Sequence, residues 1–321
     1  MWRGYATAAS ARPPTFQVFN RHVKQLQRSR AVDDVESSRR VDYLRDAVAR
    51  RLVDRLLVIK RRFDTVVDLG CGSGHVAKAL GGVKEEEAGL VGERVGKLIM
   101  ADSSAEVLHR ESSLAFGRVD VERRVVDEEV FPFDEATLDA VVSNMSMHWI
   151  NDLPGCLRKI EHALRPDGAF LASMVGGDTL FELRTAMQLA EMERLGGVSP
   201  RVSPMTDTRD LGSLMQQAGF KLLTVDVDEI VVDFPDMLAL MEDLQAMGES
   251  NAVLRREHML PRDVLLAAKA IYESLHGNKD GASVPATFRI LYMIGWKQSE
   301  GTARPLPRGS GETSLKDFLG A

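Results

Sequence analysis

The sequence contains little cysteine: Cys71 and Cys156 are the only two among 321 residues. Two cysteines are too few for the disulfide framework of a small secreted domain. They are also too far apart in the sequence for a zinc site built from cysteine. We therefore expect a chain that works in a reducing compartment.

Long apolar runs are also missing. The longest candidates, residues 138–142 and 290–296, are far shorter than the ~18 consecutive apolar residues of a membrane-spanning helix, so we expect no transmembrane segment. With 44% hydrophobic and 27% charged residues, the composition is that of a globular protein rather than a disordered, collagenous or coiled-coil one. The length allows one large domain or two small ones, and no stretch of sequence resembles a linker between independent domains.

Acidic residues are absent from residues 1–32, which contain six of the 41 basic residues. A basic, acid-free start rich in Ala, Ser and Thr is typical of a mitochondrial transit peptide, and we assign one to residues 1–15. The alternative is a basic arm that remains on the mature protein and binds a partner. Because the whole chain has a net charge of −6 despite this segment, the rest is strongly acidic, which argues against nucleic acid as a partner.

From residue 63 onward the pattern alternates between strand and helix, which is the order of an α/β protein. The expected strands lie near residues 63–70, 97–104, 122–126, 137–142, 169–175, 219–234 and 288–297. The expected helices lie near residues 41–57, 75–80, 156–164, 178–218, 237–247 and 262–276. The charged segment 81–96 is typical of a surface loop or an insertion, and residues 305–321 form a tail that we expect to be loosely held.

The strongest local motif is VVDLGCGSG, a strand that enters a glycine-rich turn and then a helix. Its glycines, Gly70, Gly72 and Gly74, let the backbone pass close to a ligand. In a dinucleotide fingerprint the third glycine comes three residues after the second, whereas here it comes two after, and no P-loop lysine follows. The spacing resembles motif I of the class I S-adenosylmethionine-dependent methyltransferases. That resemblance implies S-adenosylmethionine as cofactor, with Asp68 beside its amino group and the glycines around its methionyl part.

Three more residues stand at the ends of predicted strands, where an open parallel sheet binds its ligands. Asp102 would accept hydrogen bonds from both ribose hydroxyls, Asp127 would meet the adenine amino group, and Ser143 would complete the cofactor site. A single aspartate after a strand is more often a turn or capping residue, so the prediction depends on the set. Asp102 follows Asp68 by 34 residues instead of about 20, and an insertion at 81–96 accounts for the excess.

The segment after Ser143 would face the reacting centre. His148 is a candidate general base, and Trp149 a candidate wall for the cofactor or the substrate. The alternative is that both residues pack the end of the fourth strand against the following helix. The segment lacks the Asn-Pro-Pro-Tyr type of motif found in nucleic-acid amino methyltransferases.

Three long motifs in the second half carry a closer resemblance: GGDTLFELR, MEDLQAMGESNA and SVPATF. With them the chain, from residue 16 to 304, resembles a family of mitochondrial complex I assembly factors described as arginine hydroxylases. The resemblance implies a Rossmann-like class I methyltransferase α/β fold. Its sheet would have seven mostly parallel strands, with helical cap insertions near 178–218 and 235–276.

The same resemblance implies a function. It predicts a mitochondrial matrix protein, peripheral to the inner membrane, that binds S-adenosylmethionine and hydroxylates an arginine of an iron–sulfur subunit of the complex I matrix arm. Other complex I assembly proteins would be its partners. A weaker resemblance, to bacterial methyltransferases that esterify an acyl-carrier carboxylate, leaves methyl transfer to a carboxylate or protein side chain as an alternative. A non-catalytic assembly chaperone that retains the cofactor pocket is the second alternative.

Substrate contacts are expected from the segments beyond the fifth strand. Asp178 could hold an arginine through a bidentate pair, with Glu182 on the same helix face, although Asp178 as a helix N-cap is equally plausible. The methionine-rich helix that ends at Gly248 could cover a peptide substrate. No metal site is assigned, because the stretch His109-Arg110-Glu111 is better explained as a solvated charged helix face.

Overall fold

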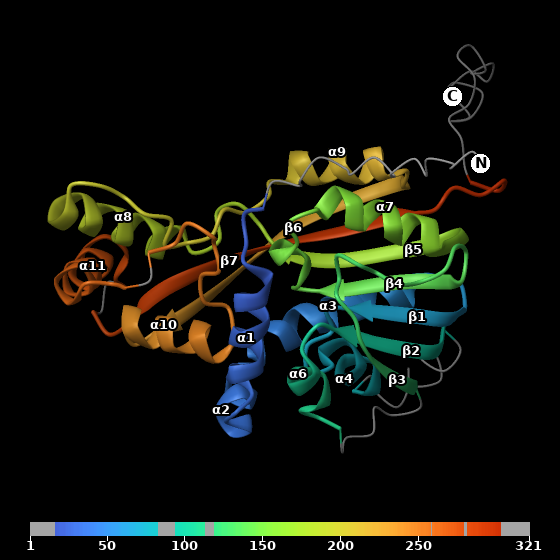
Figure 1. The fold of residues 1–321 in the computed structure, drawn as a ribbon, viewed down its shortest axis with the longest axis horizontal. Helices are drawn as coiled ribbons and strands as arrows, with labels where there is room; N and C mark the ends of the chain where they lie inside the picture. The colour runs from blue at the N-terminus through green and yellow to red at the C-terminus, as the bar shows by residue number, and fades with distance from the viewer. Residues whose placement is uncertain (1–16, 83–93, 113–118, 258, 279–280, 303–321) are drawn as a thin grey trace, which may run out of the picture.

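The structure is a computed structural model that describes residues 17–82, 94–112, 119–257, 259–278 and 281–302. Its centre is a seven-stranded sheet in the order β3-β2-β1-β4-β5-β7-β6 (Figure 1). The strands are β1 (Phe63–Leu69), β2 (Val95–Asp102), β3 (Asp120–Val125), β4 (Leu138–Asn144), β5 (Leu164–Val175), β6 (Lys221–Phe234) and β7 (Val284–Trp296). The first five strands pair in parallel, and β7 is antiparallel to both of its neighbours, β5 and β6.

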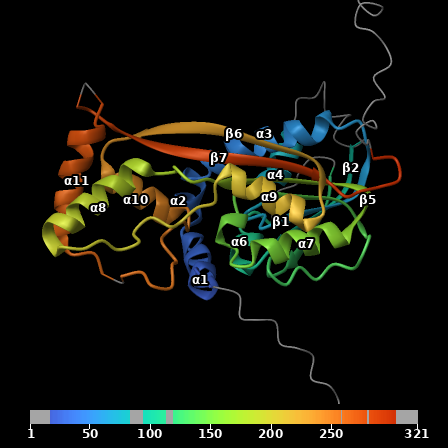
Figure 2. The same cartoon turned by 90° about the horizontal axis from the view of Figure 1, so that it is seen from above.

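The described helices pack on both faces of this sheet or beyond its end (Figure 2). They are α1 (Arg21–Ala31), α2 (Val35–Arg40), α3 (Tyr43–Val58), α4 (His75–Gly81), α6 (Ala105–His109), the 3₁₀ helix η1 (Met147–Trp149), α7 (Leu153–Ala163), α8 (Phe181–Leu195), α9 (Thr208–Ala218), α10 (Met237–Ala246) and α11 (Arg262–His276). Neighbouring strand residues alternate between the faces. Val66 and Val142 pack with α3 and α4, whereas Val67 and Val141 pack with α7 and α9.

The last two strands are long and connect the sheet to a cap. β6 has 14 residues and β7 has 13, and both run out of the parallel part of the sheet toward α8, α10 and α11 (Figure 1). The cap is therefore continuous with the main core: Met187 of α8, Leu240 of α10 and Tyr272 of α11 belong to the same buried cluster as α3 and β1. This arrangement places the cap over the ends of the strands.

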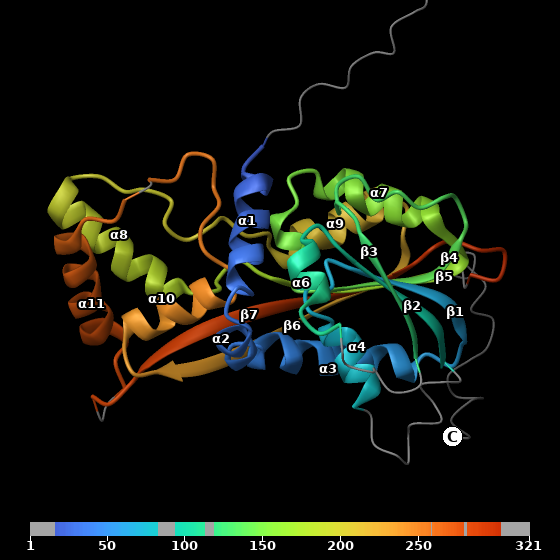
Figure 3. The same ribbon diagram turned by 60° about the horizontal axis from the view of Figure 1, so that its bottom comes forward.

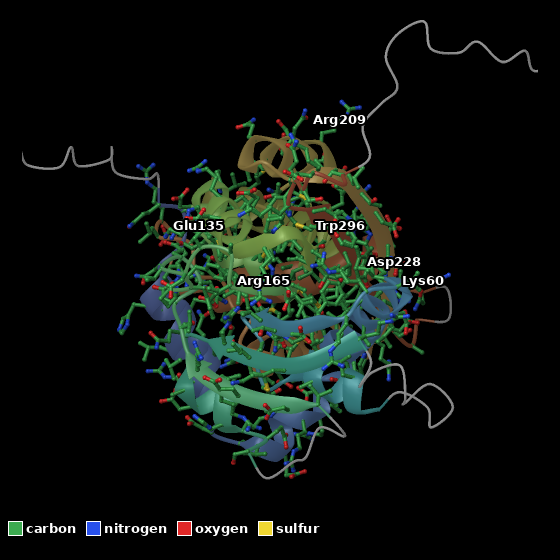
Figure 4. The ribbon with its side chains drawn as sticks, turned by 90° about the vertical axis from the view of Figure 1, so that its right-hand side faces the viewer. Lys60, Glu135, Arg165, Arg209, Asp228 and Trp296 are labelled. Carbon is green, nitrogen blue, oxygen red and sulfur yellow. The ribbon has the colours of Figure 1, made fainter. Side chains whose placement is uncertain are left out.

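The ends of the parallel strands differ in chemistry. Lys60, Glu135 and Arg165 lie at the end where β1, β4 and β5 begin (Figure 4). At the opposite, carboxyl edge, β1, β2 and β4 end in the buried residues Leu69, Asp102 and Asn144. Polar groups buried at this edge need partners or a ligand, so this is where a site is sought.

The predicted strand and helix order agrees with the structure, with local differences. The stretch near 178–218 forms two helices, α8 and α9, on either side of a loop, as expected, whereas the last strand begins at Val284, four residues earlier than expected. The transit peptide at 1–15, the tail at 305–321 and most of the segment 81–96 lie outside the described residues. In the described part, no helix is both long and apolar enough to span a membrane.

The basic segment before residue 41 contains a helix that the sequence analysis did not predict. α1 stands at the carboxyl edge between α6 and α10 (Figure 3). Its Lys24 and Arg28 are buried. Because buried cations need partners, the docking of α1 must depend on acidic and carbonyl groups at this edge.

Asn151 holds the entry to α1. Its side-chain oxygen accepts hydrogen bonds from the Val18 and Phe19 amides at 2.9 and 2.8 Å, and its amide nitrogen donates to the Phe19 carbonyl at 3.1 Å. We expect Asn151→Ala to loosen α1 without unfolding the domain, because three hydrogen bonds of about 0.5–1.5 kcal/mol each are lost. Hydrogen–deuterium exchange in α1 should speed up by ~10-fold or more, with β4 unchanged.

The control for this prediction is Asp134→Ala, which removes an exposed side chain from the segment before β4. It should leave exchange in α1 as in the wild type. Equal exchange in α1 for the wild type and Asn151→Ala would mean that Lys24 and Arg28 hold the helix without Asn151.

Candidate functional site

The glycine turn follows β1 at the carboxyl edge. Gly70, Gly72 and Gly74 all have positive φ, at 67°, 57° and 94°, which explains why the chain uses glycine at each of them. At Gly70 there is also no room for a side chain, because a Cβ atom would lie 2.1 Å from Ser146 Oγ. At Gly72 a Cβ atom would fit in ordinary van der Waals contact, with His75 Cδ2 the nearest atom at 3.6 Å.

Asp68, also at this edge, lies in an unusual environment for a carboxylate. It is fully buried on β1, and neither of its oxygens has a hydrogen-bond partner among the described residues. Burial raises the pKa of Asp68 well above its usual value, and the charge of Asp102 adds to the rise. Such a group costs stability, so it points to a ligand that supplies the missing donors.

Asp102, at the end of β2, connects the glycine turn to the segment before α6. Its oxygens accept hydrogen bonds from the Gly72 and Ser104 amides, each at 2.9 Å. Burial raises its pKa, although Arg28 opposes the rise. A carboxylate can accept about four hydrogen bonds, so Asp102 retains acceptor positions for further donors.

Asp127 and Glu128, which follow β3, differ in burial. The Asp127 side chain is 50% exposed and pairs with Arg21 at 2.7 Å, whereas the Glu128 side chain is 2% exposed and pairs with Arg21 and Arg28. Burial opposes ionisation of Glu128, but the charges of Arg28 and Arg21 outweigh it and lower its pKa. Glu128 was not among the residues predicted for the site, although the run of acidic residues after β3 points to this segment.

Arg28 of α1 reaches into the same edge. Its Nη1 atom lies 3.4 Å from Glu128 Oε1 and 3.9 Å from Asp102 Oδ2, and its Nη2 atom donates to Ser146 Oγ at 3.1 Å. The free space left beside the glycine turn is about 30 Å³. A ligand of drug size occupies a pocket of ~300–1,000 Å³, so lining side chains such as Arg28 would have to shift for one to bind here.

Ser143 is buried at the carboxyl end of β4, and its hydroxyl donates to the Leu69 carbonyl at 2.7 Å. The predicted cofactor residues Asp68, Gly70, Gly72, Asp102 and Ser143 therefore gather at one edge with Gly74 at the start of α4, while Asp127 stands at its rim. The fit to an amine- and ribose-bearing cofactor rests on the two oxygens of Asp68, which have no partner among the described residues, and on the close approach that Gly72 allows.

A second, larger cavity of about 440 Å³ lies between this edge and the cap. Its wall is mainly apolar, with Leu183, Met187, Met241 and Leu244 from the cap helices among its residues. Arg45, Met145 and Met247 line both this cavity and the small space beside the glycine turn. The two spaces are therefore neighbours that share a wall.

His148, Trp149 and Glu249 are among the polar residues of this larger cavity, which also include Arg45, Arg201, Arg256 and Glu257. Glu249 accepts a hydrogen bond from Trp149 Nε1 at 2.6 Å, is paired with Arg45, and lies 3.5 Å from His148 Nε2. Burial opposes ionisation, but His148 and the charges of Arg45 and Lys24 hold the pKa of Glu249 well below its usual value. Burial lowers the pKa of His148.

Glu249 was not predicted as a site residue, although the motif containing it was noted. His148 and Trp149 lie at the cavity as the reaction-centre hypothesis requires, and Trp149 also packs against Phe19 with ring centroids 5.1 Å apart. Packing and a role in the site are therefore compatible for Trp149. The catalytic assignments of both residues stay predictions.

Asp178 does not reach the cavity. Its side chain is 70% exposed and pairs with Arg289 at 2.5 Å, while Glu182 is buried and accepts a hydrogen bond from the Thr287 hydroxyl, also at 2.5 Å. The expectation of a shared face was therefore wrong. The N-cap alternative was also wrong, because the cap position of α8 is Leu180, in the left-handed region.

The described residues include no group of three or more His, Cys, Asp or Glu side chains placed to hold a metal ion. The sequence predicted that His109-Arg110-Glu111 lies on a solvated charged helix face. This prediction was wrong for Arg110 and Glu111. Arg110 and Glu111 are nearly buried, Arg110 pairs with Asp42, and Glu111 pairs with Arg39 at 2.9 Å. These pairs fasten α6 to α2 and α3.

Comparison with known proteins agrees with this architecture. The family model described as a methyltransferase domain matches residues 41–225, more than half of the chain. The crystal structure of the YcgJ protein from Bacillus subtilis has a TM-score of 0.53 at 15% identity, over 77% of this chain and 98% of that one. The predicted fold class, a methyltransferase-like α/β fold with seven mostly parallel strands, is confirmed.

Two curated relatives cover most of the chain. The mitochondrial arginine-hydroxylase NDUFAF5 of Danio rerio is 46% identical over 318 residues, which are 99% of this chain and 92% of that protein. A malonyl-[acyl-carrier protein] O-methyltransferase of Methylovorus sp. (strain MP688) is 31% identical over 264 residues, which are 82% of this chain and 85% of that protein.

Proposed function

We propose, because this chain belongs to the NDUFAF5 family of methyltransferase-domain proteins, that it is a mitochondrial enzyme that binds S-adenosylmethionine and hydroxylates a protein arginine. The observation that carries the activity is the 46% identity to a relative of that name over 99% of the chain. The observation that carries the cofactor is the buried Asp68 carboxylate, which has no partner among the described residues and stands beside the glycine turn.

The cofactor contacts follow from the residues at the carboxyl edge. Asp68 would accept from the cofactor's amino group, Asp102 from its ribose hydroxyls and Asp127 from its adenine, with the glycine turn and Ser143 beside it. When bound, S-adenosylmethionine supplies a sulfonium centre with an electrophilic methyl group. Arg28 would exchange its contacts with Asp102 and Glu128 for a new position at the rim.

The larger cavity would take the substrate side chain. Its apolar wall excludes water, and His148 and Glu249 stand where the cavity approaches the cofactor edge through the shared residues Arg45, Met145 and Met247. Trp149 would flank the substrate. Because burial lowers its pKa, His148 is neutral at physiological pH and can accept a proton there.

Hydroxylation exchanges one C–H bond of the arginine for a C–OH group, a two-electron oxidation of the carbon. With dioxygen as the oxidant, one oxygen atom enters the substrate and the other leaves as water. The second oxygen takes two electrons and two protons from an external reductant. The part that we assign to this chain is to bind and orient the arginine and to keep bulk water away from it.

The proposed setting is the mitochondrial matrix, at the periphery of the inner membrane. The arginine would belong to an iron–sulfur subunit of the complex I matrix arm, with other complex I assembly proteins as partners. The word mitochondrial in the relatives' names and the basic, acid-free first 32 residues support the compartment. The resemblance of the three long motifs supports the subunit class.

Methyl transfer to a carboxylate or a protein side chain is the second candidate function. The observation that favours it is the 31% identity to a malonyl-[acyl-carrier protein] O-methyltransferase. This reaction would use the same two spaces and would need chiefly an acceptor held in line with the sulfonium.

Peptide mass spectrometry of the complex I iron–sulfur subunits tests the proposal. Cells that lack this protein should be complemented with the wild type, with Asp68→Ala, or with the control Glu135→Ala at the opposite end of the sheet (Figure 4). We expect one added oxygen on an arginine with the wild type and the control, and its loss with Asp68→Ala.

The other possible results of this experiment would each favour a different function. Loss of a methylene-sized mark in the deletion would favour methyl transfer. Absence of any lost mark, together with normal complex I assembly by Asp68→Ala, would overturn both catalytic proposals and favour the assembly chaperone.

A further inference from the structure

The polar wall of the larger cavity includes hydrogen-bond acceptors as well as the guanidinium groups of Arg45, Arg201 and Arg256. We infer that Glu249 and His148 Nδ1 form the anchor for the guanidinium group of the substrate. This inference rests on the proposed function, because it assigns specificity to the same site. It replaces Asp178, which the structure places at the surface, as the source of the acidic contact.

Glu249 has the charge and the free capacity that the anchor requires. Its side chain is 16% exposed and ionised, and its oxygens receive hydrogen bonds from Trp149 Nε1 and Arg45. A carboxylate offers about four acceptor positions, and with Trp149, Arg45 and His148 Nε2 in place about one remains for an N–H donor. Arg45 shows that a guanidinium group is compatible with this carboxylate, since one from the chain itself already pairs there.

His148 supplies the second acceptor. Its Nε2 atom lies 3.5 Å from Glu249 Oε2, so the proton of the neutral ring belongs on Nε2, facing the carboxylate. Nδ1 then carries a lone pair. The His148 side chain is 7% exposed, and Nδ1 has no hydrogen-bond partner among the described residues. A guanidinium has only donors, so it complements both acceptors, whereas a carboxylate ligand would have no donor to offer them.

The rest of the cavity suits the stem of an arginine. The space of about 440 Å³ is walled mainly by aliphatic and methionine side chains from α8 and α10, against which methylene groups can pack. The shared wall with the glycine turn brings a side chain held at Glu249 toward the cofactor edge.

The surrounding cations determine the pH dependence. Arg45 and Arg256 line the cavity, and Lys24 and Arg28 lie close to the same carboxylate. Burial lowers the pKa of Lys24 to about 7, with the three arginines contributing. Lys24 therefore loses its charge as the pH rises through about 7, which removes repulsion toward an entering guanidinium. Affinity for a cationic ligand should rise from pH 6 to pH 8, and affinity for an anionic one should fall.

Binding of small probes to the purified full-length protein tests the anchor. The probes are N-acetyl-arginine amide and its neutral isostere N-acetyl-citrulline amide, measured by ligand-observed NMR and by Trp149 fluorescence. We expect the arginine probe to bind the wild type at least ~10-fold more tightly than the citrulline probe. We expect Glu249→Gln to remove that preference.

Two variants separate an anchor from a merely structural residue. Glu193→Gln, which neutralises an exposed acid of α8, should bind the arginine probe like the wild type. Arg45→Met vacates an acceptor position on Glu249 and should bind it more tightly, by ~3-fold or more. The thermal midpoint serves as the folding check for every variant, and binding of S-adenosylhomocysteine adds a second check for Glu193→Gln, which lies away from the cofactor edge.

Equal binding of the two probes by the wild type, absence of arginine binding, or weaker binding by Arg45→Met would each overturn the inference. If Glu249→Gln fails to fold, the sign of the Arg45→Met effect decides. A wild type that selects the arginine probe through Glu249 while cells show no hydroxylated arginine would overturn the proposed function and leave the guanidinium anchor intact.

Discussion

Asp68→Ala should bind S-adenosylmethionine at least ~100-fold more weakly than the wild type and yet unfold at a temperature a few degrees higher. The affinity loss follows because a buried carboxylate that pairs with a cationic amine contributes several kcal/mol. The stability gain follows because Asp68 is buried with no partner among the described residues, and removing such a group recovers about 1–3 kcal/mol.

The size of the stability gain depends on pH. The unfolded Asp68 ionises near its ordinary value of 3.8, whereas the folded group has a raised pKa and stays protonated to higher pH. Between those values the folded state binds more protons, so wild-type stability falls as the pH rises. The advantage of Asp68→Ala should therefore widen from pH 4 to pH 7.

Calorimetry of the cofactor-free proteins at both pH values, together with titration of S-adenosylmethionine, would measure the two effects. Glu135→Ala is again the control and should change neither quantity. A variant that lost stability at pH 7, or that kept wild-type affinity, would show that Asp68 has a structural partner and is not the cofactor's carboxylate.

Gly70→Ala should destabilise the fold by about 3–5 kcal/mol, whereas Gly72→Ala should cost about 1–2 kcal/mol. Both positions have positive φ, at 67° and 57°, so the conformational part of the cost is similar. The two positions differ in the room that is available for a side chain. A Cβ at Gly70 would lie 2.1 Å from Ser146 Oγ and 2.4 Å from Ser146 Cβ, whereas at Gly72 the nearest neighbour is 3.6 Å away.

Urea unfolding of the two variants, compared at equal slope, measures this contrast. The double variant Gly70→Ala/Ser146→Gly should recover the steric part and bring the cost close to that of Gly72→Ala. Equal costs for the two single variants would mean that η1 and Ser146 yield easily, so that the turn has more room than the structure indicates.

The residues that sequence reasoning placed correctly are those whose position follows from local pattern. Asp68 and Asp102 end strands of a parallel sheet, and such ends meet at one edge whatever the rest of the chain does. The three glycines follow from the left-handed turn between β1 and α4. For these, strand periodicity and turn chemistry suffice.

The residues that sequence reasoning missed are positioned by contacts between segments that are far apart in the sequence. Arg28 meets Glu128 across 100 residues of sequence, and Arg45 meets Glu249 across 204. At Asp127 and Glu128 a shift of one residue decides which side chain is buried, because neighbouring residues after a strand face opposite ways. Asp178 failed because the chain turns at Leu180 before α8 begins.

The helix α1, which covers the carboxyl edge of the sheet, contacts the segment after α10. Lys24 donates to the carbonyls of Gly248 and Ser250, which are 224 and 226 residues further along the chain. α1 therefore cannot complete its docking until the segment after α10 is in place. Because these contacts join residues more than 220 positions apart, we expect enclosure of the cofactor edge to be a late step of folding. A ligand that needs α1 in place would then bind only the completed fold.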